Sequence, residues 1–501
     1  MADQQVLQRR IVIIGAGIGG ICAAIRLSGA GYRDIVVLDR ADRIGGTWRD
    51  NSYPGSGCDV PSHLYSFSFA RNPGWSRKFV EQPEILEYLE HCVDRFRIRP
   101  MLRLGTTVTG ATFDAGRGVW QIGIDSADGA AELEADVLIA ATGQLNRPFV
   151  PDLAGLDSFT GPVFHSARWH HDTNLVGRDV AVIGNGASAV QFVPRIAPLA
   201  RSVTVYQRSA NWILPKPDRR FSRLERKLFA LVPPLEIAYR WSIYLRFETR
   251  FSAFLEGSRL TGLLEKVALG HLKSQIVDRE VRATQRPDYR AGCKRILISN
   301  DYLASLDRPC STVVTEPIDH VDATGITDTS GVRRPADAVI FATGFRTTEF
   351  LSPIDIRGRD GQRLTDAWSE GPKAHFGITV PGFPNLFILY GPNTNLGHNS
   401  IIFMLERQVT HVLAALEEAD RRRSTTIEVR GPVAAASDDD LQRHAQRTVW
   451  LSSCSNWYKD EAGRLTNNWP KNTIRYWRDT RQLGPDDYEF SGGVAGERGS
   501  A

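Results

Sequence analysis

This chain of 501 residues lacks closely spaced pairs of cysteines. Its six cysteines are scattered, and no two of them form a C-x-x-C motif. This spacing argues against a metal-binding knuckle and against a flavin disulfide reductase, and it suits a reducing compartment. We therefore expect no metal site and a cytoplasmic protein.

An excess of charge of either sign is also lacking. The chain has 61 lysines and arginines against 57 acidic residues, a formal net charge of +4, which gives no reason to expect a nucleic acid partner. Residues 1–10 lack the apolar core of a signal peptide. The apolar stretch 11–27 contains spaced glycines, which favour a strand, turn and helix over a membrane span. We expect a soluble monomer or dimer with no stable membrane insertion.

The first informative motif is a glycine-rich turn near the N-terminus. An apolar strand predicted at Ile11–Ile14 leads into Gly15, Gly17 and Gly20 of a G-x-G-x-x-G sequence. The first glycine permits a tight turn, the second lets the backbone approach a pyrophosphate, and the third allows a helix to pack on the strand. A second apolar strand ends at Asp39, where a carboxylate can accept a hydrogen bond from a ribose hydroxyl. These features predict a dinucleotide site.

A second motif of the same kind begins after the apolar strand predicted at Asp179–Ile183. Gly184 and Gly186 form the turn, and Ser188 lies at the start of the following helix. Ala189 replaces the third glycine, which the motif tolerates. The sequence therefore predicts two dinucleotide sites.

The strand after the second motif ends without an acidic residue. Arg208 and Ser209 stand where a carboxylate would repel a ribose 2′-phosphate. A guanidinium instead forms charge-assisted hydrogen bonds with phosphate. Such bonds contribute roughly 1.5–3 kcal/mol each, so the pattern favours NADPH over NADH. A solvated surface charge is the alternative for Arg208.

The segment between the two motifs resembles a family fingerprint. Phe159, Gly161, His165 and Trp169 give F-x-G-x-x-x-H-x-x-x-W, which is similar to the signature of type I Baeyer–Villiger monooxygenases, a branch of the flavin-containing monooxygenase superfamily. That family usually has Pro or Asp after the tryptophan, whereas this chain has His170. The resemblance implies a linker between a flavin domain and an NADPH domain. A loop with a buried aromatic ring and a bonded histidine is the alternative.

A second signature of the same family covers residues 45–59. The resemblance implies that Thr47 and Trp48 contact the flavin and that Asp59 is the active-site carboxylate. A turn with a solvated acid is the alternative reading of this motif.

Further site residues follow from the resemblance alone. It implies that Arg295 is the catalytic arginine and that Lys294 binds the NADPH phosphate. The remaining residues implied to bind the cofactor FAD are Tyr65, Thr142 and Asn395, the last in a loop before a helix predicted from Ile401.

The implied fold is α/β, with two Rossmann-like dinucleotide-binding domains and a helical insertion. A chain of this length accommodates two or three domains. Residues 1–150 and 346–501 are expected to form a discontinuous FAD-binding domain. Residues 151–220 and 293–345 would form the NADPH-binding domain, and 221–292 the insertion.

Some local predictions come from periodicity. It predicts a helix over 83–96 and strands over 119–124 and 133–139. Apolar helices of the insertion, such as 228–232 and 239–247, are expected to pack in the core or beside the substrate, and membrane contact is the alternative.

The resemblance implies an FAD- and NADPH-dependent monooxygenase. NADPH would reduce the flavin, dioxygen would add to form a peroxyflavin, and this nucleophile would attack a ketone to give an ester or lactone. The anionic adduct requires a fixed cation, which suits an arginine. Oxidation of an amine or sulfide is the nearest alternative, and a non-catalytic flavin protein is the other.

Overall fold

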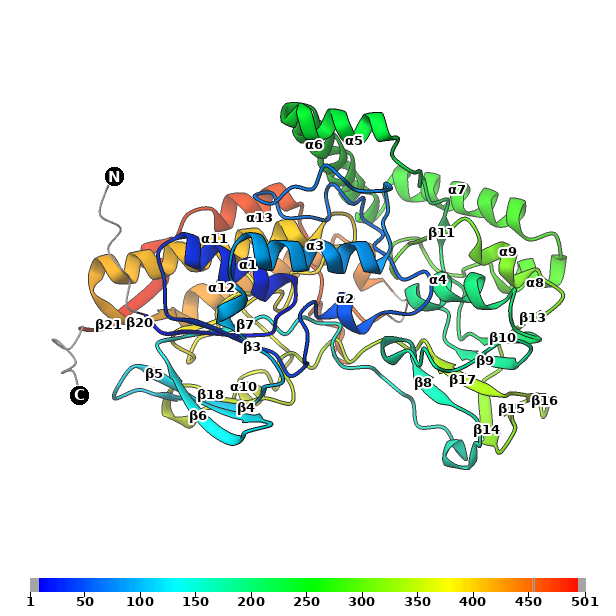
Figure 1. Ribbon diagram of the computed structural model, residues 1–501, viewed down its shortest axis with the longest axis horizontal. Coiled ribbons are helices and arrows are strands. Elements are labelled where there is room, and N and C mark those ends of the chain that lie inside the picture. The colour runs from blue at the N-terminus through cyan, green and yellow to red at the C-terminus, as the bar shows by residue number, and fades with distance from the viewer. Residues whose placement is uncertain (1–8, 453, 455, 494–501) are drawn as a thin grey trace.

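Two parallel β-sheets form the two halves of the computed structural model, which describes residues 9–452, 454 and 456–493 (Figure 1). The first sheet has the strand order β19-β7-β1-β2-β3 and the second β13-β10-β9-β17-β8. The strands of the first are β1 Ile11–Ile14, β2 Ile35–Leu38, β3 Leu102–Arg103, β7 Val137–Ala140 and β19 Leu386–Ile388. Those of the second are β8 Val163–His165, β9 Asp179–Ile183, β10 Ser202–Tyr206, β13 Ser311–Val314 and β17 Ala338–Phe341.

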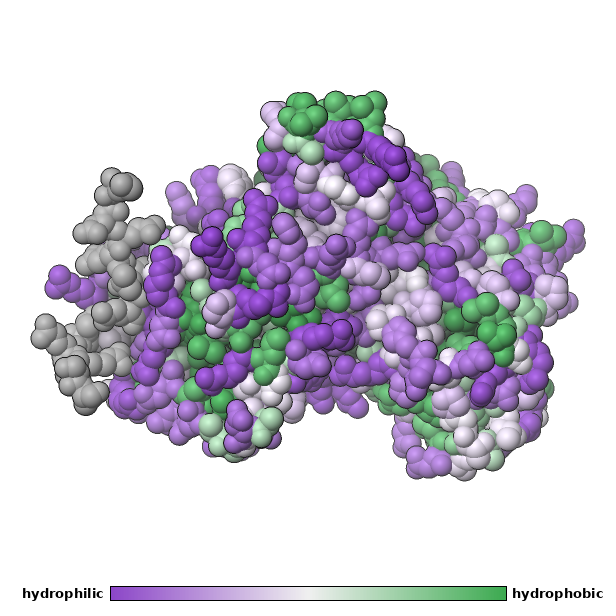
Figure 2. Space-filling model, in the orientation of Figure 1, coloured by the Kyte–Doolittle hydropathy of each residue, from purple (hydrophilic) through white to green (hydrophobic). Residues whose placement is uncertain are grey.

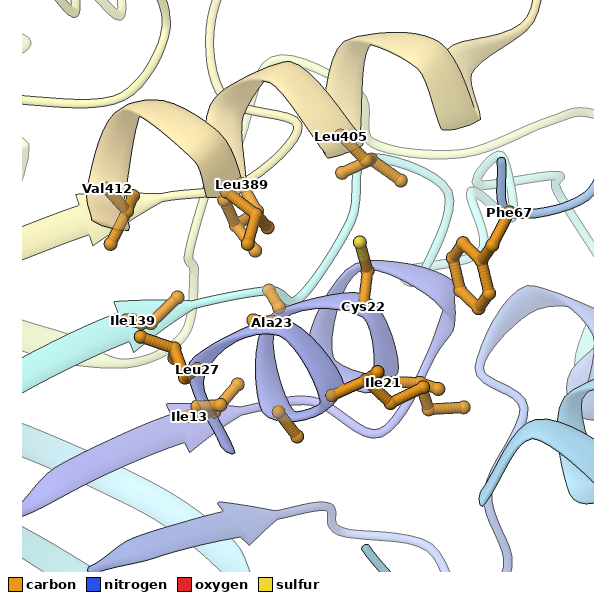
Figure 3. Packing of buried hydrophobic residues seen from close by; sticks show 14 of the residues in the cluster. Ile13, Ile21, Cys22, Ala23, Leu27, Phe67, Ile139, Leu389, Leu405 and Val412 are labelled. Carbon is orange, nitrogen blue, oxygen red and sulfur yellow. The ribbon is translucent and has the colours of Figure 1, made fainter. Parts of the chain in front are cut away.

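Helix α1 (Ile18–Gly29) lies between the first sheet and helix α11 (Ile401–Arg422), as Figure 3 shows. Its side chains meet Ile13 and Ile139 of the sheet on one side and Leu405 and Val412 of α11 on the other. Leu27 of α1 is fully buried in this cluster. Burying one such side chain contributes about 1.5–3 kcal/mol, so this cluster holds the turn before α1 in place.

Seven further α-helices of the described residues lie outside the segment 221–292. They are α2 Thr47–Asp50, α3 Gln82–Arg95, α4 Ala187–Ile196, α9 Tyr302–Leu306, α10 Leu364–Ala367, α12 Gly431–Ala445 and α13 Thr473–Thr480. Smaller sheets have the orders β18-β4-β5-β6, β14-β15-β16, β11-β12 and β20-β21. Their strands are β4 Thr107–Asp114, β5 Val119–Ser126, β6 Gly129–Ala135, β11 Ile213–Leu214, β12 Leu297–Ile298, β14 Ile318–Asp322, β15 Gly325–Asp328, β16 Arg333–Pro335, β18 Asp355–Arg357, β20 Ser424–Val429 and β21 Tyr488–Gly493.

The segment after residue 221 is helical, as predicted. It contains α5 Arg223–Leu231, α6 Pro233–Thr249, α7 Arg259–Gln275 and α8 Arg279–Thr284. Ser222 and Glu225 form a capping box at the start of α5, with hydrogen bonds of 3.1 and 2.8 Å. Pro233 then starts α6, and the two helices stand at the top of the molecule in Figure 1. Among the described residues, no helix is long and apolar enough to cross a membrane.

One strand prediction was wrong. The stretch 133–139 is not a single strand, because β6 ends at Ala135 and β7 begins at Val137 in a different sheet. Asp136 lies at the change, where its N–H donates to the carbonyl of Arg10 and its Oδ2 accepts from the N–H of Arg10. Residues on both sides of it are buried, so hydrophobicity alone does not mark the boundary. The predicted helix over 83–96 and strand over 119–124 are confirmed as α3 and β5.

Candidate active site

A pocket opens where the strands of the first sheet end, as expected for a parallel α/β sheet. Its lining includes seven of the residues predicted to bind a cofactor: Gly15, Gly17, Asp39, Thr47, Trp48, Tyr65 and Thr142. Gly20 has a different place, between helix and strand. A Cβ atom there would lie 1.8 Å from the carbonyl oxygen of Gly15. Gly20 therefore permits the packing of α1 rather than lining the pocket.

Two glycines that line this pocket, Gly17 and Gly46, approach each other closely. A Cβ atom on Gly46 would lie 3.0 Å from the Cα of Gly17. Helix α1 begins just after Gly17, with no side-chain cap and no acidic residue in its first turn. Its free N–H groups and the positive end of the helix dipole suit a pyrophosphate.

Asp39 is buried at the edge of the pocket and already has three partners. Ala16 and Ala41 donate their N–H groups to its carboxylate, at 2.8 and 2.9 Å. Arg49 donates from Nη1 to Oδ1 at 3.2 Å. Burial lowers the pKa of Arg49, but its hydrogen bond to Asp50 and the charges of Asp39 and Asp50 raise it above its usual value. Sequence reasoning missed Arg49, although it directly follows the tryptophan of the second signature.

Two aromatic side chains form one wall of the pocket. Trp48 donates from Nε1 to the hydroxyl of Tyr65 at 3.2 Å, and their rings meet edge to face. Ile401 and Leu405, from the first turns of α11, also line the pocket. The first turn of α11 has no acidic residue and no side-chain cap. Its positive end therefore favours negative charge on a bound group.

The second glycine turn has the same geometry as the first. Gly184 has a φ of +100°, and a Cβ atom there would lie 2.5 Å from the carbonyl oxygen of Ala342. Gly186 precedes α4, which begins without a side-chain cap. Ser188 lies in the first turn of that helix. The amide groups of this turn are thus available to a second anion.

Arg208, Ser209 and Lys294 lie together beside this turn. Lys294 donates from Nζ to Oγ of Ser209 at 2.6 Å. Burial, and then the charge of Arg208, lower the pKa of Lys294. Arg208 is exposed and forms no ion pair or hydrogen bond with the part of the chain that the structure describes. Two cations held close together suit a phosphate group, and the charge of Asp288 acts on Lys294 in the opposite direction to that of Arg208.

Arg295 and Asp59 meet although 236 residues separate them, which is 295 minus 59. Nε of Arg295 lies 3.8 Å from Oδ2 of Asp59. Burial raises the pKa of Asp59, against the opposing effect of the charges of Arg295 and Lys216. Burial disfavours the charge on Arg295, but Asp59 and Tyr458 more than compensate and raise its pKa. The pair therefore supplies a guanidinium that stays charged in a partly desolvated place.

Two further residues lie near this pair, and sequence reasoning missed the first of them. Lys216 comes from the loop after β11, and no pattern in the sequence distinguishes it from other lysines. Tyr458 is buried in the C-terminal segment, and burial raises its pKa to about 12. Both act on the pair electrostatically.

Asn395 does not line the pocket. Its Oδ1 accepts from the hydroxyl of Tyr390 at 2.8 Å, and its Nδ2 donates to Oδ1 of Asn468 at 2.6 Å. Tyr390 itself lines the pocket. Asn395 thus supports a lining residue, and its direct contact with a cofactor stays a prediction.

The chain is similar to known proteins over most of its length. The model of the FMO-like family, flavin-binding monooxygenase-like, matches residues 8–353. A Baeyer–Villiger monooxygenase of Pseudomonas aeruginosa is 43% identical over 484 residues, which cover 96% of this chain and 91% of the relative. This chain belongs to the Baeyer–Villiger monooxygenases. The family prediction is confirmed.

Solved structures agree with this assignment. The enzyme is similar to cyclohexanone monooxygenase from Rhodococcus sp. Phi1 bound to NADP+, with a TM-score of 0.87 and 27% identity over 97% of this chain and 99% of that one. It is also similar to the OTEMO complex with FAD and NADP, with a TM-score of 0.87 and 26% identity over 97% and 100% of the two chains. The predicted α/β fold with two dinucleotide-binding domains is confirmed.

His165 of the fingerprint joins the two linkers of this Baeyer–Villiger monooxygenase. It is buried, its Nδ1 accepts from the N–H of Ala167 at 3.1 Å, and its ring packs against Phe345. Phe345 belongs to the returning linker, where Phe149 donates its N–H to the carbonyl of Gly344 at 2.9 Å. Burial lowers the pKa of His165 to about 4, so the ring is neutral at neutral pH.

The rest of the fingerprint packs tightly around the same linker. Phe159 is buried, and a Cβ atom on Gly161 would lie 2.4 Å from the carbonyl oxygen of Asp337. Trp169 packs against Phe164 and Phe192. Only glycine fits at position 161, because any side chain would collide with the backbone of Asp337, which directly precedes β17 of the second sheet.

Residues beside Trp169 reach the flavin signature. Nη1 of Arg168 lies 3.6 Å from Oδ1 of Asp50, and Nε2 of His171 shares a hydrogen bond of 2.8 Å with Oγ of Ser52. His170, the departure from the family pattern, stacks on Phe164 with ring centroids 4.8 Å apart. The fingerprint therefore contacts both halves of the enzyme.

A disulfide joins Cys293 to Cys454, which are 161 residues apart in sequence. The scattered cysteines suit a reducing compartment, and no spacing in the sequence predicts this pair. It ties the loop of Lys294 and Arg295 to the C-terminal segment that contains Tyr458. Among the described residues, no group of three or more His, Cys, Asp or Glu side chains is arranged to hold a metal ion.

Proposed function

We propose that this monooxygenase inserts one oxygen atom of dioxygen next to the carbonyl of a small-molecule ketone, giving an ester or lactone. It uses FAD at the first glycine turn and NADPH at the second. The observation that carries the proposal is the Arg295–Asp59 pair, 3.8 Å apart, in which Arg295 directly follows Lys294 in the chain. The domain boundaries given above, a cytoplasmic location and a monomeric or dimeric state belong to the same proposal.

The residues of the first pocket fit FAD. Gly17 and Gly46 leave room for a pyrophosphate at the start of α1, and Asp39 retains lone pairs for a ribose hydroxyl. Trp48 and Tyr65 offer flat apolar surface to a ring system. When bound, FAD accepts a hydride from NADPH and activates dioxygen for attack on the ketone.

The second turn fits NADPH rather than NADH. Arg208 and Lys294 supply two cations beside Ser209, and the strand before them ends in Gln207 instead of an acid. The side chain of Gln207 is turned inward, since it donates to the carbonyl of Thr284 at 3.0 Å. No carboxylate therefore opposes a 2′-phosphate at this strand end.

Arg295 stabilises the oxyanion that forms when the ketone carbonyl is attacked. Its planar guanidinium donates hydrogen bonds in fixed directions and stays charged when buried. Asp59 orients the group and compensates its charge, so that the cation is not left unpaired in a desolvated site. The side chain of Arg295 keeps 37% of its surface accessible, so a substrate oxygen can reach the guanidinium.

Product analysis tests this function. The purified enzyme is supplied with NADPH, oxygen and a panel of cyclic, linear and aryl ketones, and the products are identified by mass spectrometry. We expect an ester or lactone from at least one class, with NADPH consumed in equal amount. An amine and a sulfide form the comparison arm, because their oxidation creates no carbonyl oxyanion. Oxidation of these compounds with no ester from any ketone would overturn the proposal.

A further inference from the structure

Helices α5 and α6 carry a group of exposed apolar side chains, which we call the apolar tip. Its members are Leu224, Leu228, Leu231, Val232, Leu235, Trp241 and Leu245. Leu231 is 78% exposed, Leu224 66%, Leu245 55% and Trp241 54%. Figure 2 shows the tip as a green area at the top of the molecule, where α5 and α6 stand in Figure 1. Large apolar surfaces of this kind mark interaction sites.

The exposure of the tip is not a defect of packing. The opposite faces of the two helices are already buried in an aromatic cluster, in which Phe221, Phe229 and Tyr239 surround His63. Arg240 fixes α6 further by donating to the carbonyl of Ser66 at 3.0 Å. The residues of the tip therefore cannot turn inward, because those positions are filled.

The exposed charged side chains of the segment that carries the tip all have the same sign. In residues 216–250, all of which the structure describes, the exposed charged side chains are Arg219, Arg220, Arg223, Lys227, Arg246 and Arg250. The acidic residues of this segment are partly or fully buried and bound to other groups. Glu225 pairs with Arg219 at 2.7 Å, and Glu236 pairs with Arg71 at 2.7 Å. Of these cations, Arg219 is paired with Glu225, and Arg219, Arg246 and Arg250 all act electrostatically on Lys78. The cations beside the tip are therefore Arg223 and Lys227 of α5.

Two of these cations lie beside the leucines on α5 itself. Arg223 and Lys227 form no ion pair with the described part of the chain. Leucines at positions 224, 228 and 231 lie on one face of α5 by their spacing of four and three residues. A helix with a leucine face and flanking unpaired cations has the design of a segment that lies in the interface of a bilayer.

We infer that the apolar tip docks the enzyme reversibly on a membrane surface that contains anionic lipids. The leucines and Trp241 enter the headgroup region, and the cations contact lipid phosphates. Docking is peripheral, because α6 is only 17 residues long and the described helices include none that could cross a bilayer. This inference is independent of the ketone chemistry proposed above.

A second copy of the chain is a less suitable occupant. A two-fold interface places the same patch on both sides. The exposed cations of one tip would then face those of the other with no exposed carboxylate from 216–250 between them. Like charges brought together in this way weaken an interface, whereas an anionic lipid surface neutralises them.

Vesicle co-sedimentation of the full-length enzyme with bound FAD tests the inference. The vesicles consist of phosphatidylcholine alone, or of phosphatidylcholine mixed equally with phosphatidylglycerol. We expect binding to the anionic vesicles that weakens as salt is added. Leu231→Ser should lower the partition coefficient about tenfold, because the transfer of one leucine side chain out of water strengthens partitioning by roughly that factor. Arg223→Gln with Lys227→Gln should lower binding to the anionic vesicles and leave binding to phosphatidylcholine unchanged.

The matched control is Val277→Ser with Arg308→Gln, which removes an exposed apolar side chain and an exposed cation outside the tip. This control should bind like the wild type. FAD content and unfolding temperature of every variant show that the fold is retained. Absence of binding to both vesicle types, or unchanged binding by Leu231→Ser, would overturn the inference. If Leu231→Ser changed the enzyme from dimer to monomer in sedimentation velocity and kept its vesicle binding, the tip would be assigned to a second copy instead.

Discussion

Nε of Arg295 lies 3.8 Å from Oδ2 of Asp59. The two residues come from loops that belong to different halves of the enzyme, Asp59 from the end of the flavin signature and Arg295 from the loop after the helical insertion. Burial raises the pKa of Asp59, and the charge of Asp59 raises that of Arg295 against the effect of burial. Each residue therefore affects the charge state of the other, and the contact joins the two halves of the enzyme.

Removal of the guanidinium should uncouple the enzyme. Arg295→Ala should still consume NADPH, with the electrons released as hydrogen peroxide and little ester formed. Loss of one such donor costs about 2.7–4 kcal/mol of transition-state stabilisation. Asp59→Ala should show a milder form of this defect, and Arg295→Lys should rescue little, because lysine lacks the planar fork. Ester formation by Arg295→Ala at the wild-type rate would show that another cation serves the reaction.

Removal of Arg208, the cation proposed to bind the 2′-phosphate of NADPH, should change the cofactor preference. Arg208→Ala should raise the KM for NADPH by one to two decades and leave the KM for NADH nearly unchanged, since each charge-assisted hydrogen bond contributes about 1.5–3 kcal/mol. Steady-state kinetics with both cofactors measure this. Arg201→Ala is the matched control, because this exposed arginine pairs with Asp179 at the other end of the strand. Equal losses with NADPH and NADH would exclude a phosphate role for Arg208.

His165 should couple the two halves without transferring a proton. With a pKa of about 4 it is neutral throughout the range in which the enzyme is assayed, so it adds no ionisation to the pH–rate profile. His165→Ala should slow both flavin reduction and oxygenation while FAD stays bound, because the contact with Phe345 is lost. Stopped-flow absorbance of the flavin separates the two steps. Normal turnover in this variant would show that the fingerprint is only structural.

Buried histidines should make the enzyme sensitive to acid. Burial lowers the pKa of His63, His165 and His411 to about 4, and that of His375 to about 3. Between the unfolded value of about 6.5 and these values, the unfolded chain binds more protons than the folded enzyme. Stability is therefore present above pH ~6.5 and is lost as the pH falls through this window, by at most about 3 kcal/mol for each of the first three histidines and about 5 kcal/mol for His375.

Thermal unfolding at several pH values tests this. His63→Phe should lose less stability on acidification than the wild type, because phenylalanine suits the aromatic cluster and does not titrate. His320→Phe, a change of an exposed histidine, is the control and should behave like the wild type. An identical loss in His63→Phe and wild type would contradict the assignment.

The disulfide should stabilise the loop that carries Arg295. Reduction of Cys293–Cys454 should lower the free energy of unfolding by about 2–4 kcal/mol and increase hydrogen peroxide release, since Arg295 follows Cys293 by two residues. Cys293→Ser with Cys454→Ser should be insensitive to dithiothreitol. Cys310→Ser, a change of a free cysteine, should keep the wild-type response. A wild-type enzyme that gains no stability on oxidation would contradict this role.

Much of the fold was predictable because it depends on short-range geometry. The strands β1 and β9 and the turns at Gly15 and Gly184 follow from apolar runs and from positive φ angles that favour glycine. Such features are encoded within a few residues. The helical nature of the insertion follows from its periodicity in the same way. The family resemblance added the candidate Arg295, which no local pattern singles out among many arginines.

Only the tertiary structure decided which residues meet. The Arg295–Asp59 contact, the cluster of Arg208 with Lys294 and the Cys293–Cys454 disulfide each join segments far apart in sequence. The outward direction of Leu231 is of the same kind, because it depends on Phe229 and its neighbours having filled the inner face. Sequence alone determined the local conformations of this enzyme and two nucleotide-binding turns. Packing between distant segments determined its charge pairs and its exposed apolar tip, because burial and Coulomb energies depend on distance in space and not on separation along the chain.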